Sequence, residues 1–463
     1  MIDILQGLKP APFLRPALNI GCGFDILTGQ YYTGKFGESL LSGGVSHLTG
    51  IVGRGNMFKT ALMLFMMIRV LDRYAETYAL IYDNEMSLTI RRIQNMLREV
   101  AAALMDCNLA EAKRLVLVDR TLYTGDEWYE WLKTTTEERR KMKKEDIGVT
   151  PFIDNEGKNV EILVPFLNLV DSLSQFATNS VMKMQENDIG ESERNMEFMR
   201  DGAAKTQMLM ELPTLSARNG LYVMFTAHVG DEIAMNPMAP PQKKLTFLKN
   251  QNKLKNVPEK FTFLMNNCWY VNSATPLMNQ ATKAPEFPRD SEDAMRGDTD
   301  LMLLNVTNLR GKSGPTGMPF EVVVSQSEGV KVGLTEFNYI RNFDRFGLGG
   351  SDRNYFLELC PDISLSRTTI RGKIEESAKL RRALEITCEM CQIANLWHNI
   401  QPELICTPKQ LYDDLKMRGY DWDVLLATRG YWTFNNEKHP VPYLSTMDLL
   451  NMRAGLYKPY WMH

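Results

Sequence analysis

Apolar residues along the chain gather into short continuous runs that alternate with helix-like stretches. From residue 46 on, such runs occupy residues 47–52, 78–82, 115–118, 164–170, 220–226, 268–271 and 300–306. Continuous apolar runs separated by helices are typical of a mostly parallel sheet that is buried on both faces. The pattern therefore predicts an α/β fold built around such a sheet.

The strand pattern fades after about residue 348, and helical periodicity replaces it. Residues 377–398 read as an amphipathic helix, and residues 407–419 as a second one that begins at the N-cap Thr407 and stops at Gly419. Residues before 41 are rich in glycine, proline and aromatic side chains and show little periodicity. The expected organisation is an N-terminal arm (1–40), an α/β core (41–345) and a smaller, mainly helical C-terminal domain (346–463).

Composition excludes a globally basic DNA-coating protein. The 463 residues include 53 Lys and Arg against 56 Asp and Glu, a net charge of −3, so that any nucleic-acid surface must be a local patch. The 7 cysteines are scattered, which indicates a reducing compartment, and the first residues do not resemble a secretory signal. We therefore expect a cytoplasmic protein. Cys388, Cys391, His398 and Cys406 either form a zinc site or are small buried side chains.

The strongest motif follows the first apolar run. Residues 53–60 have the spacing G-x-x-x-x-G-K-T, with phenylalanine where the last glycine normally stands. Glycines let the backbone form a nest of N–H groups around phosphate oxygens, and the helix that follows adds its positive end. The lysine would reach the β- and γ-phosphates, and the threonine would hold Mg²⁺. The expected nucleotide-binding residues are Gly53, Arg54, Gly55, Asn56, Met57, Phe58, Lys59 and Thr60; the alternative is a glycine turn with an incidental Lys-Thr.

Two further runs end in carboxylates. Asp171 follows the run 164–170 and either organises Mg²⁺ or caps a helix. Glu85 follows the run 78–82 and either polarises the water that attacks the γ-phosphate or belongs to a solvated helix start. With the loop, and in this order along the chain, they indicate an ATPase that uses ATP and Mg²⁺.

Over residues 15–345 this arrangement resembles the RecA-like P-loop ATPase core of strand-exchange recombinases and, more distantly, of hexameric DnaB-type helicases. The nearest likeness is to the UvsX-type phage recombinases, on three features. Phe58 precedes the loop lysine, residues 20–45 are similar to the recombinases' glycine-rich lead-in, and the run 221–227 leads into His228. The resemblance implies a RecA-like fold and, if the chain is phage-encoded, the cytoplasm of a bacterial host.

The resemblance also assigns roles to matching positions. Glu85 corresponds to the catalytic glutamate, and Asp171 to the aspartate that organises Mg²⁺. His228 corresponds to a residue that senses the γ-phosphate, or else it is a buried structural histidine. Arg310 and Lys312 lie in a run similar to "KxRxGPTG", whose cations reach the nucleotide of a neighbouring subunit. Their order is reversed here, and a basic hairpin turn is the alternative.

Two long interruptions of the strand pattern fall where RecA-type proteins carry DNA-binding loops. Residues 185–202 hold two arginines among many acids and also fit a solvated charged helix. Residues 241–263 are rich in lysine and phenylalanine, which suits single-stranded DNA because cations neutralise phosphates and aromatic rings stack on bases. The candidates are Arg194, Arg200, Lys243, Lys244, Phe247, Lys249, Lys253, Lys255 and Lys260. A further basic run, Arg367, Arg371, Lys373, Lys379, Arg381 and Arg382, either extends a DNA path or covers a helix surface.

Together these features favour an ATP-dependent DNA strand-exchange recombinase that forms a helical homo-oligomeric filament on single-stranded DNA during recombination and repair. Loading and single-strand-binding proteins are the further partners that the resemblance allows. A replicative-type helicase that closes into hexameric rings is the main alternative. A DNA-organising protein that binds ATP without turnover is another.

Overall fold

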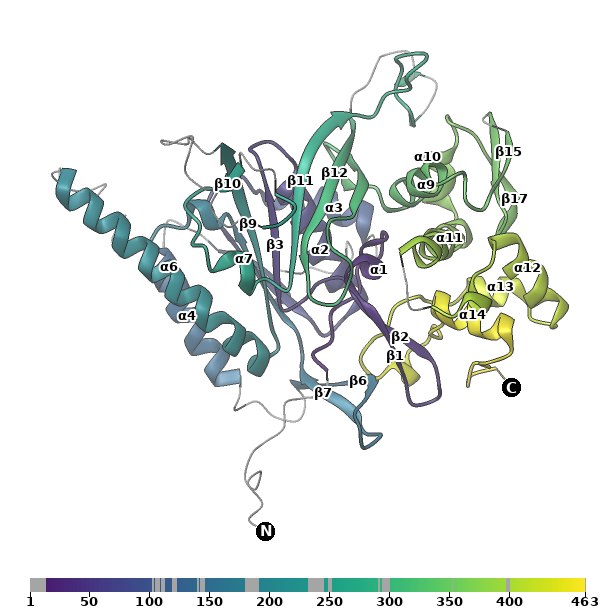
Figure 1. The fold of residues 1–463 in the computed structure, drawn as a ribbon, viewed down its shortest axis with the longest axis horizontal. Helices are drawn as coiled ribbons and strands as arrows, with labels where there is room; N and C mark the ends of the chain where they lie inside the picture. Colours follow the sequence, from purple (N-terminus) through teal and green to yellow (C-terminus); the bar gives the residue numbers. More distant parts are fainter. Residues whose placement is uncertain are drawn as a thin grey trace, which may run out of the picture.

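A large mixed sheet forms the centre of the computed structural model (Figure 1). The structure describes residues 14–101, 104, 109, 113–118, 123–139, 141, 146–179, 191–231, 245–248, 252–289, 292–293, 300–351, 353–396 and 400–462. In this part of the chain, no helix combines the length and the apolar character that a membrane span requires.

The sheet has the strand order β14-β13-β12-β11-β3-β9-β8-β4-β5, and β10 adds to β9. All pairs from β11 to β5 are parallel, whereas β10, β12, β13 and β14 pair antiparallel. Each apolar run named above is a strand of this sheet, so the predicted α/β class with a mostly parallel sheet is confirmed. The strands are β3 (Leu48–Gly53), β4 (Tyr78–Asp83), β5 (Leu115–Val118), β8 (Phe166–Asp171), β9 (Leu221–Asp231), β10 (Asn252–Leu254), β11 (Asn267–Pro276), β12 (Leu301–Gly311), β13 (Pro319–Ser325) and β14 (Gly329–Val330).

Helices cover both faces of the sheet, which explains why its strands are apolar on both sides. The helices α2 (Lys59–Arg73) and α3 (Ile90–Val100) pack on one face, where Ile51 and Ile81 join their core cluster. The helices α4 (Gly125–Arg139) and α6 (Glu191–Asn219) pack on the other, against Val52 and Leu80. Neighbouring residues of one strand thus enter different cores, as the two-residue period of a strand requires.

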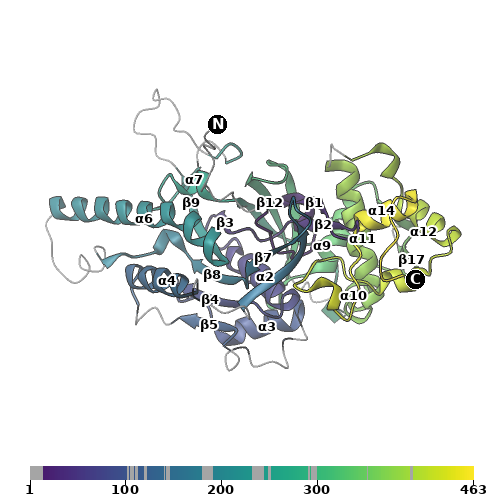
Figure 2. The same ribbon diagram turned by 90° about the horizontal axis from the view of Figure 1, so that it is seen from below.

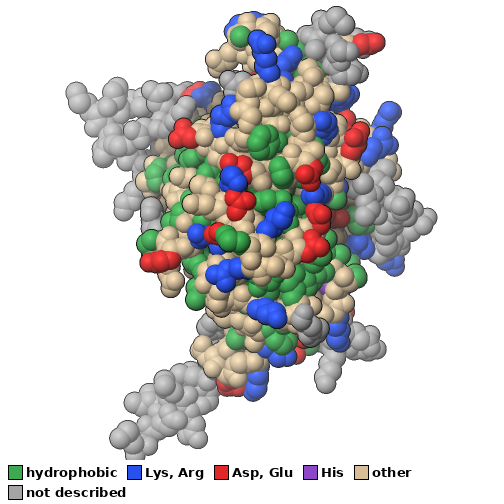
Figure 3. Space-filling view, turned by 90° about the vertical axis from the view of Figure 1, so that its right-hand side faces the viewer, with side chains coloured by type: hydrophobic (Ala, Val, Ile, Leu, Met, Phe, Trp, Pro, Cys, Tyr) green, Lys and Arg blue, Asp and Glu red, His purple; other side chains and the backbone are tan. Residues whose placement is uncertain are grey.

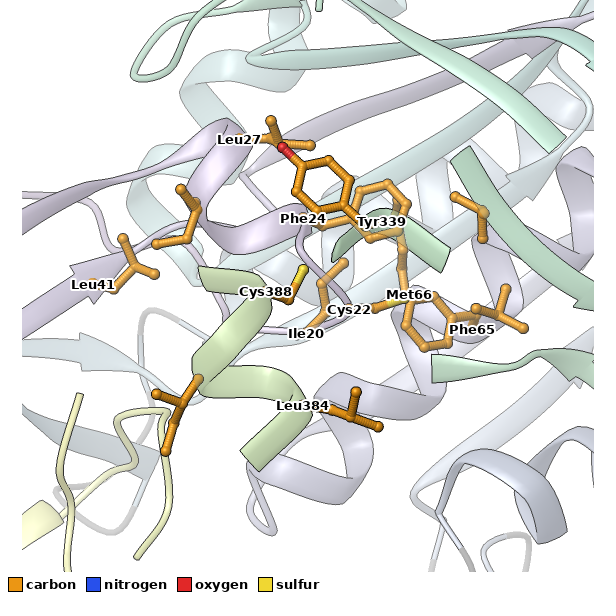
Figure 4. Close-up of a cluster of buried hydrophobic side chains, with 14 of the residues drawn as sticks. Ile20, Cys22, Phe24, Leu27, Leu41, Phe65, Met66, Tyr339, Leu384 and Cys388 are labelled. Carbon is orange, nitrogen blue, oxygen red and sulfur yellow. The ribbon is translucent and has the colours of Figure 1, made fainter. Parts of the chain in front are cut away.

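The N-terminal segment departs from the expected arm. Its described part, from residue 14 on, forms the short helix α1 (Phe24–Thr28) and a hairpin of β1 (Gln30–Thr33) and β2 (Ser39–Ser42). Phe24 is fully buried and meets Trp269 of the sheet edge-on, with ring centroids 5.0 Å apart. Figure 4 shows Ile20, Cys22 and Phe24 between α2 and the C-terminal part of the chain. The aromatic and apolar side chains of this segment therefore pack into the core.

The C-terminal part lies at one end of the molecule and the free end of α6 at the other (Figures 1 and 2). Both predicted helices are confirmed, and Thr407 forms a reciprocal capping box with Gln410. A small antiparallel sheet was missed: β15 (Leu348–Ser351), β16 (Asn354–Leu357) and β17 (Cys360–Leu365) are short and half exposed. Helix α9 (Val332–Asn342) ends the core and packs against this part. The helices of the C-terminal part itself are α10 (Ile370–Glu376), α11 (Ala378–Leu396), α12 (Pro408–Met417), α13 (Trp422–Leu426) and α14 (Thr446–Ala454).

Basic and acidic side chains are interspersed over the face shown in Figure 3, without a large area of one sign.

A second hairpin, β6 (Ile147–Ile153) and β7 (Asn159–Leu163), reaches from the core to the C-terminal part. There the backbone N–H of Asn435 donates to the carbonyl of Val149, 2.9 Å away. The core and the C-terminal part are thus joined through more than one segment.

Candidate nucleotide site

The carboxyl ends of β3, β4, β8 and β9 meet at one edge of the sheet. The strand register places Gly53 beside His228 and Asp83 beside Asp171. In open α/β sheets, ligands bind outside the carboxyl ends of the parallel strands. The phosphate-loop motif, Glu85, Asp171 and His228 are therefore brought to the same edge of the sheet.

The loop between β3 and α2 has backbone features of an anion site. Helix α2 begins at Lys59, and no side chain caps the first N–H groups of that helix. Free N–H groups at a helix start, with the positive end of the helix dipole, attract phosphate. A Cβ at Gly53 would come within 3.2 Å of the Val271 carbonyl oxygen, whereas one at Gly55 would meet nothing within 4 Å. The loop is thus tightly seated at Gly53 and open at Gly55.

Phe58 adopts the conformation that glycine normally provides at this position of the motif. Its φ is 55°, in the left-handed region that side chains other than glycine seldom enter. The ring is half-buried and packs against the core cluster that includes α2. Packing of the ring helps to offset the backbone cost of the left-handed conformation, so a phenylalanine replaces the usual glycine without changing the course of the loop.

Lys59 is a buried cation with little negative charge to pair with. The residue is only 6% exposed, and its ammonium group donates a hydrogen bond to the carbonyl of Arg54 at 2.7 Å. Burial lowers the pKa of Lys59, and the carboxylates of Asp171 and Glu85 counteract this only in part. An anion in the loop would supply the missing charge, so Lys59 fits a phosphate ligand.

Asp171 holds two hydroxyl groups rather than capping a helix. Thr60 Oγ1 donates to Asp171 Oδ2 at 2.5 Å, and the Thr226 hydroxyl donates to Oδ1. Burial raises the pKa of Asp171, while both hydrogen bonds lower it. A hydroxyl and a buried carboxylate in contact are oxygen ligands of the kind that Mg²⁺ prefers. Thr226 was missed, although it lies two residues before His228 and so faces the same side of β9.

Glu85 and His228 form a pair next to these groups. Glu85 Oε1 lies 2.6 Å from His228 Nε2, and the side chains are 23% and 21% exposed. The hydrogen bond with His228 lowers the pKa of Glu85 and outweighs the effect of burial. Ser174 was also missed: its hydroxyl oxygen accepts from the backbone N–H of His228 at 2.8 Å. The pair therefore links the segment after β4 to β9, with Glu85 ionised.

Arg310 and Lys312 lie toward the other end of the parallel strands, where β3 and β11 begin. Arg310 pairs with Cys268 at the start of β11, which lies level with Gly50 rather than with the loop. Its Nε donates to the carbonyl of Met265 at 3.0 Å, and burial and Arg310 lower the pKa of Lys312. These two cations are not brought to the loop of their own chain. Arg310 is near the end of β12, and Lys312 begins the turn that leads into the antiparallel strand β13.

The described residues of the lysine-rich segment 241–263 are divided between the two ends of the parallel strands. Lys253 and Lys255 are exposed on or beside β10, beyond His228. Lys260 lies at the other end, at the start of α7 (Phe261–Leu264), with its ammonium 5.4 Å from the centre of the exposed Phe263 ring. Phe247 is 43% exposed, and a Cβ at Gly317 would touch its ring. Arg200 is exposed on α6, whereas Lys243, Lys244, Lys249 and the side chain of Arg194 lie outside the described residues.

The cysteines of the suggested zinc site are core residues. Cys388 and Cys391 lie on α11 and are buried in the core cluster, as is Cys406. His398 lies outside the described residues. Among the side chains that the structure does describe, no three His, Cys, Asp or Glu gather as metal ligands.

Comparison with known proteins adds little to this geometry. No protein-family model matches the chain, and no curated protein matches it. Among solved structures, the crystal structure of the RadB recombinase is similar to 62% of this chain and 92% of its own, at 14% sequence identity and a TM-score of 0.32.

Proposed function

We propose that the chain binds ATP with Mg²⁺ at residues 53–60 and hydrolyses it. The observation that carries this proposal is the direct contact between Thr60, at the start of α2, and the buried Asp171 of β8, beside the underpaired Lys59. The alternatives weighed for the separate motifs do not account for this convergence, because an N-cap aspartate or an incidental Lys-Thr need not face each other.

Each residue of the site has its own role in binding or hydrolysing ATP. Lys59 and the free N–H groups at the start of α2 bind the phosphates, and Thr60 and Asp171 hold Mg²⁺. The metal, when bound, neutralises charge that develops on the transferred phosphoryl group. Glu85 accepts the proton of the attacking water, and His228 orients the Glu85 carboxylate and keeps it ionised. Because His228 belongs to β9, the pair can also report the state of the phosphate to the segment that follows β9.

We infer further that the active site is completed by a second copy of the chain. Arg310 and Lys312 lie at the end of the parallel strands opposite to the loop, so a head-to-tail neighbour could bring them to it. Cations supplied in this way stabilise transition-state charge. Head-to-tail contacts generate rings or open helical filaments. We propose on this basis that the chain is a DNA-dependent ATPase and a strand-exchange recombinase. Its copies would assemble as a filament on single-stranded DNA.

The exposed residues of the lysine-rich segment support a single-strand path. Lys253 and Lys255 lie beside the end of β9 that carries His228, where the backbone N–H of Lys255 donates to the His228 carbonyl. Lys260 and Phe263 lie just before β11, and Phe247 lies against Gly317, just after β12, so these three are toward the end of the strands where Arg310 is. A DNA strand that runs along this segment would thus touch residues near both ends of each subunit.

ATP hydrolysis measured with and without single-stranded DNA tests the proposal, and we expect strong stimulation of hydrolysis by the DNA. No stimulation would remove the DNA part of it. Open filaments seen by electron microscopy with ATP would exclude the helicase alternative, and closed hexamers would exclude the recombinase.

Mixing two inactive variants tests the shared site. Lys59→Ala removes the loop cation and Arg310→Ala removes the neighbour's cation, so each variant alone should hydrolyse little ATP. In an equimolar mixture about a quarter of the sites combine an intact loop with an intact Arg310, because neighbours assemble at random. Phosphate release should therefore recover to about a quarter of the wild-type rate. A mixture as inactive as its components would contradict a site shared between subunits.

The pH dependence of hydrolysis tests the pairing of Glu85 with His228. The hydrogen bond holds the pKa of Glu85 below its usual range, so the carboxylate stays ionised until the pH falls through that lowered value. Removing the ring in His228→Ala raises the pKa of Glu85, and the acid limb of the kcat profile should move to higher pH. His439→Ala, which alters a histidine of the C-terminal part, should leave the limb in place. An unmoved limb in His228→Ala would show that Glu85 is not the titrating base.

A further inference from the structure

A cavity of about 970 Å³ lies between the core and the C-terminal part, at the end of α2 opposite to the phosphate loop. Helix α2 contributes Arg69 and Arg73, the last of which is about 20 Å along the helix axis from Lys59. Helices α9, α10 and α11 and the segment 428–431 form most of the remaining lining, to which Arg98 of α3, Arg289 and Glu328 are added. The cavity is therefore separate from the proposed ATP site but shares a helix with it.

Arginine dominates the lining of this cavity. Eight arginines and four glutamates line it, and the arginines include Arg69, Arg73, Arg371, Arg381, Arg382 and Arg429. Three of these belong to the basic run that the sequence left open between a DNA path and a plain helix surface. Arg371 and Arg382 are in fact buried, at 4% and 6% exposed, so neither alternative describes them.

Several carboxylates around the cavity are shared by more than one buried guanidinium group. Glu385 pairs with both Arg73 and Arg382, at 3.3 and 2.6 Å. Glu328 pairs with both Arg371 and Arg289, at 2.8 and 3.0 Å. Burying a cation is costly unless an anion and hydrogen-bond acceptors surround it. Glu328 also pairs with Lys331, at 2.5 Å. Asp25 adds a second carboxylate for Arg73, and Asp300 is shared by Arg289 and Arg371. Because eight arginines but only four glutamates line the cavity, positive charge is still in excess there.

Two further observations concern the hydrogen bonds and the charge around the cavity. The Nε atoms of Arg73 and Arg382 are buried and have no acceptor among the described residues. Glu336, which also lines the cavity, has its pKa raised well above the usual range by burial and by the charges of Glu385 and Glu389. Burial and the neighbouring carboxylates thus disfavour the charged form of Glu336, which weakens its contribution against the arginines.

We propose that this cavity binds a short polyphosphate anion, either the phosphate chain of a free nucleoside triphosphate or inorganic tripolyphosphate. A guanidinium group can bind phosphate through two parallel N–H···O hydrogen bonds. A volume of about 1,000 Å³ lies at the upper end of the range for small-ligand sites. A ligand here bridges Arg73 of the core helix α2 and Arg382 of the C-terminal helix α11. Enclosure between the two parts favours a short anion over a nucleic-acid strand.

Calorimetric titration of the full-length Lys59→Ala protein with tripolyphosphate at low salt tests the proposal, because the phosphate loop is disabled there. We expect binding of about one equivalent, and a rise in Tm as the ligand is added. The double variant Arg98→Ala/Arg381→Ala, in the same background, removes two exposed cations of the cavity rim and should weaken binding about tenfold or more. Arg91→Ala/Arg418→Ala removes two exposed arginines outside the cavity and should change nothing.

A parallel titration with ATP separates the sources of the anion. Affinity equal to that of tripolyphosphate shows recognition of the phosphate chain alone, and tighter binding of ATP shows that the base is also held. The proposal is overturned if the Lys59→Ala protein does not bind tripolyphosphate, or if the rim variant binds as tightly as its parent. It is also overturned if only a single-stranded oligonucleotide binds in a manner that depends on Arg98 and Arg381.

Discussion

Lys59→Ala should lower the affinity for ATP by about 100-fold or more and bring hydrolysis below detection. Lys59 is the buried cation of the loop, and its ammonium donates to the Arg54 carbonyl rather than to a carboxylate. In the ATP complex this ammonium gains the negative charge that the free protein lacks. Equilibrium titration with a fluorescent ATP analogue measures the affinity, and phosphate release measures the turnover.

The same variant should be as stable as the wild type without ATP, or more stable. Burial lowers the pKa of Lys59, which means that the charged form costs free energy on folding. Thermal unfolding without nucleotide should therefore show an unchanged or higher Tm, while the gain in Tm on adding ATP disappears. Lys158→Ala, which removes an exposed lysine of the β6–β7 hairpin, is the matched control and should keep that gain. Wild-type ATP affinity in Lys59→Ala would mean that the nucleotide does not sit on this loop.

Local sequence pattern determines much of the fold. Strands such as β3 and β8 were predictable because a parallel strand covered on both faces must be apolar throughout. Capping chemistry likewise located the start of α12 at Thr407. The small sheet β15–β17 could not be predicted, because its strands are short and half exposed. Strand order was also out of reach, since it depends on contacts between residues far apart in the chain.

For the candidate site, the sequence indicated residue types and the structure added their partners. Lys59, Thr60, Asp171 and Glu85 stand out because the chemistry of phosphates and Mg²⁺ restricts which residues can serve. Thr226 carries no such signal, because threonine is common in strands for steric reasons. Its hydroxyl becomes relevant only when β9 lies beside β8 and brings it to Asp171.

Charge patterns were the least predictable feature. The basic run near residue 371 fits either a DNA path or a solvated helix surface, yet Arg371 and Arg382 are buried and face a cavity between two parts of the molecule. The lysine-rich segment after His228 reads as one patch, yet its described residues divide between opposite ends of the parallel strands. In both cases the side chains are placed by tertiary contacts rather than by their neighbours in sequence.

Glu85→Gln separates catalysis from nucleotide binding. Glutamine keeps the shape of the side chain and can still bond His228, but it cannot accept a proton from water. We expect kcat to fall by about 100-fold or more, the range in which general bases contribute. ATP affinity should stay the same or rise, because the negative charge of Glu85 no longer opposes the phosphates.

The matched control is Glu76→Gln, which neutralises an exposed carboxylate just before β4, at the opposite end of the strand from Glu85. Its rate and affinity should equal those of the wild type. Single-turnover phosphate release, with ATP affinity measured on the same samples, distinguishes slow chemistry from poor binding. An unchanged rate of release in Glu85→Gln would argue that the site binds ATP without using this carboxylate. The pairing of Glu85 with His228 would then serve to report bound nucleotide rather than to activate water.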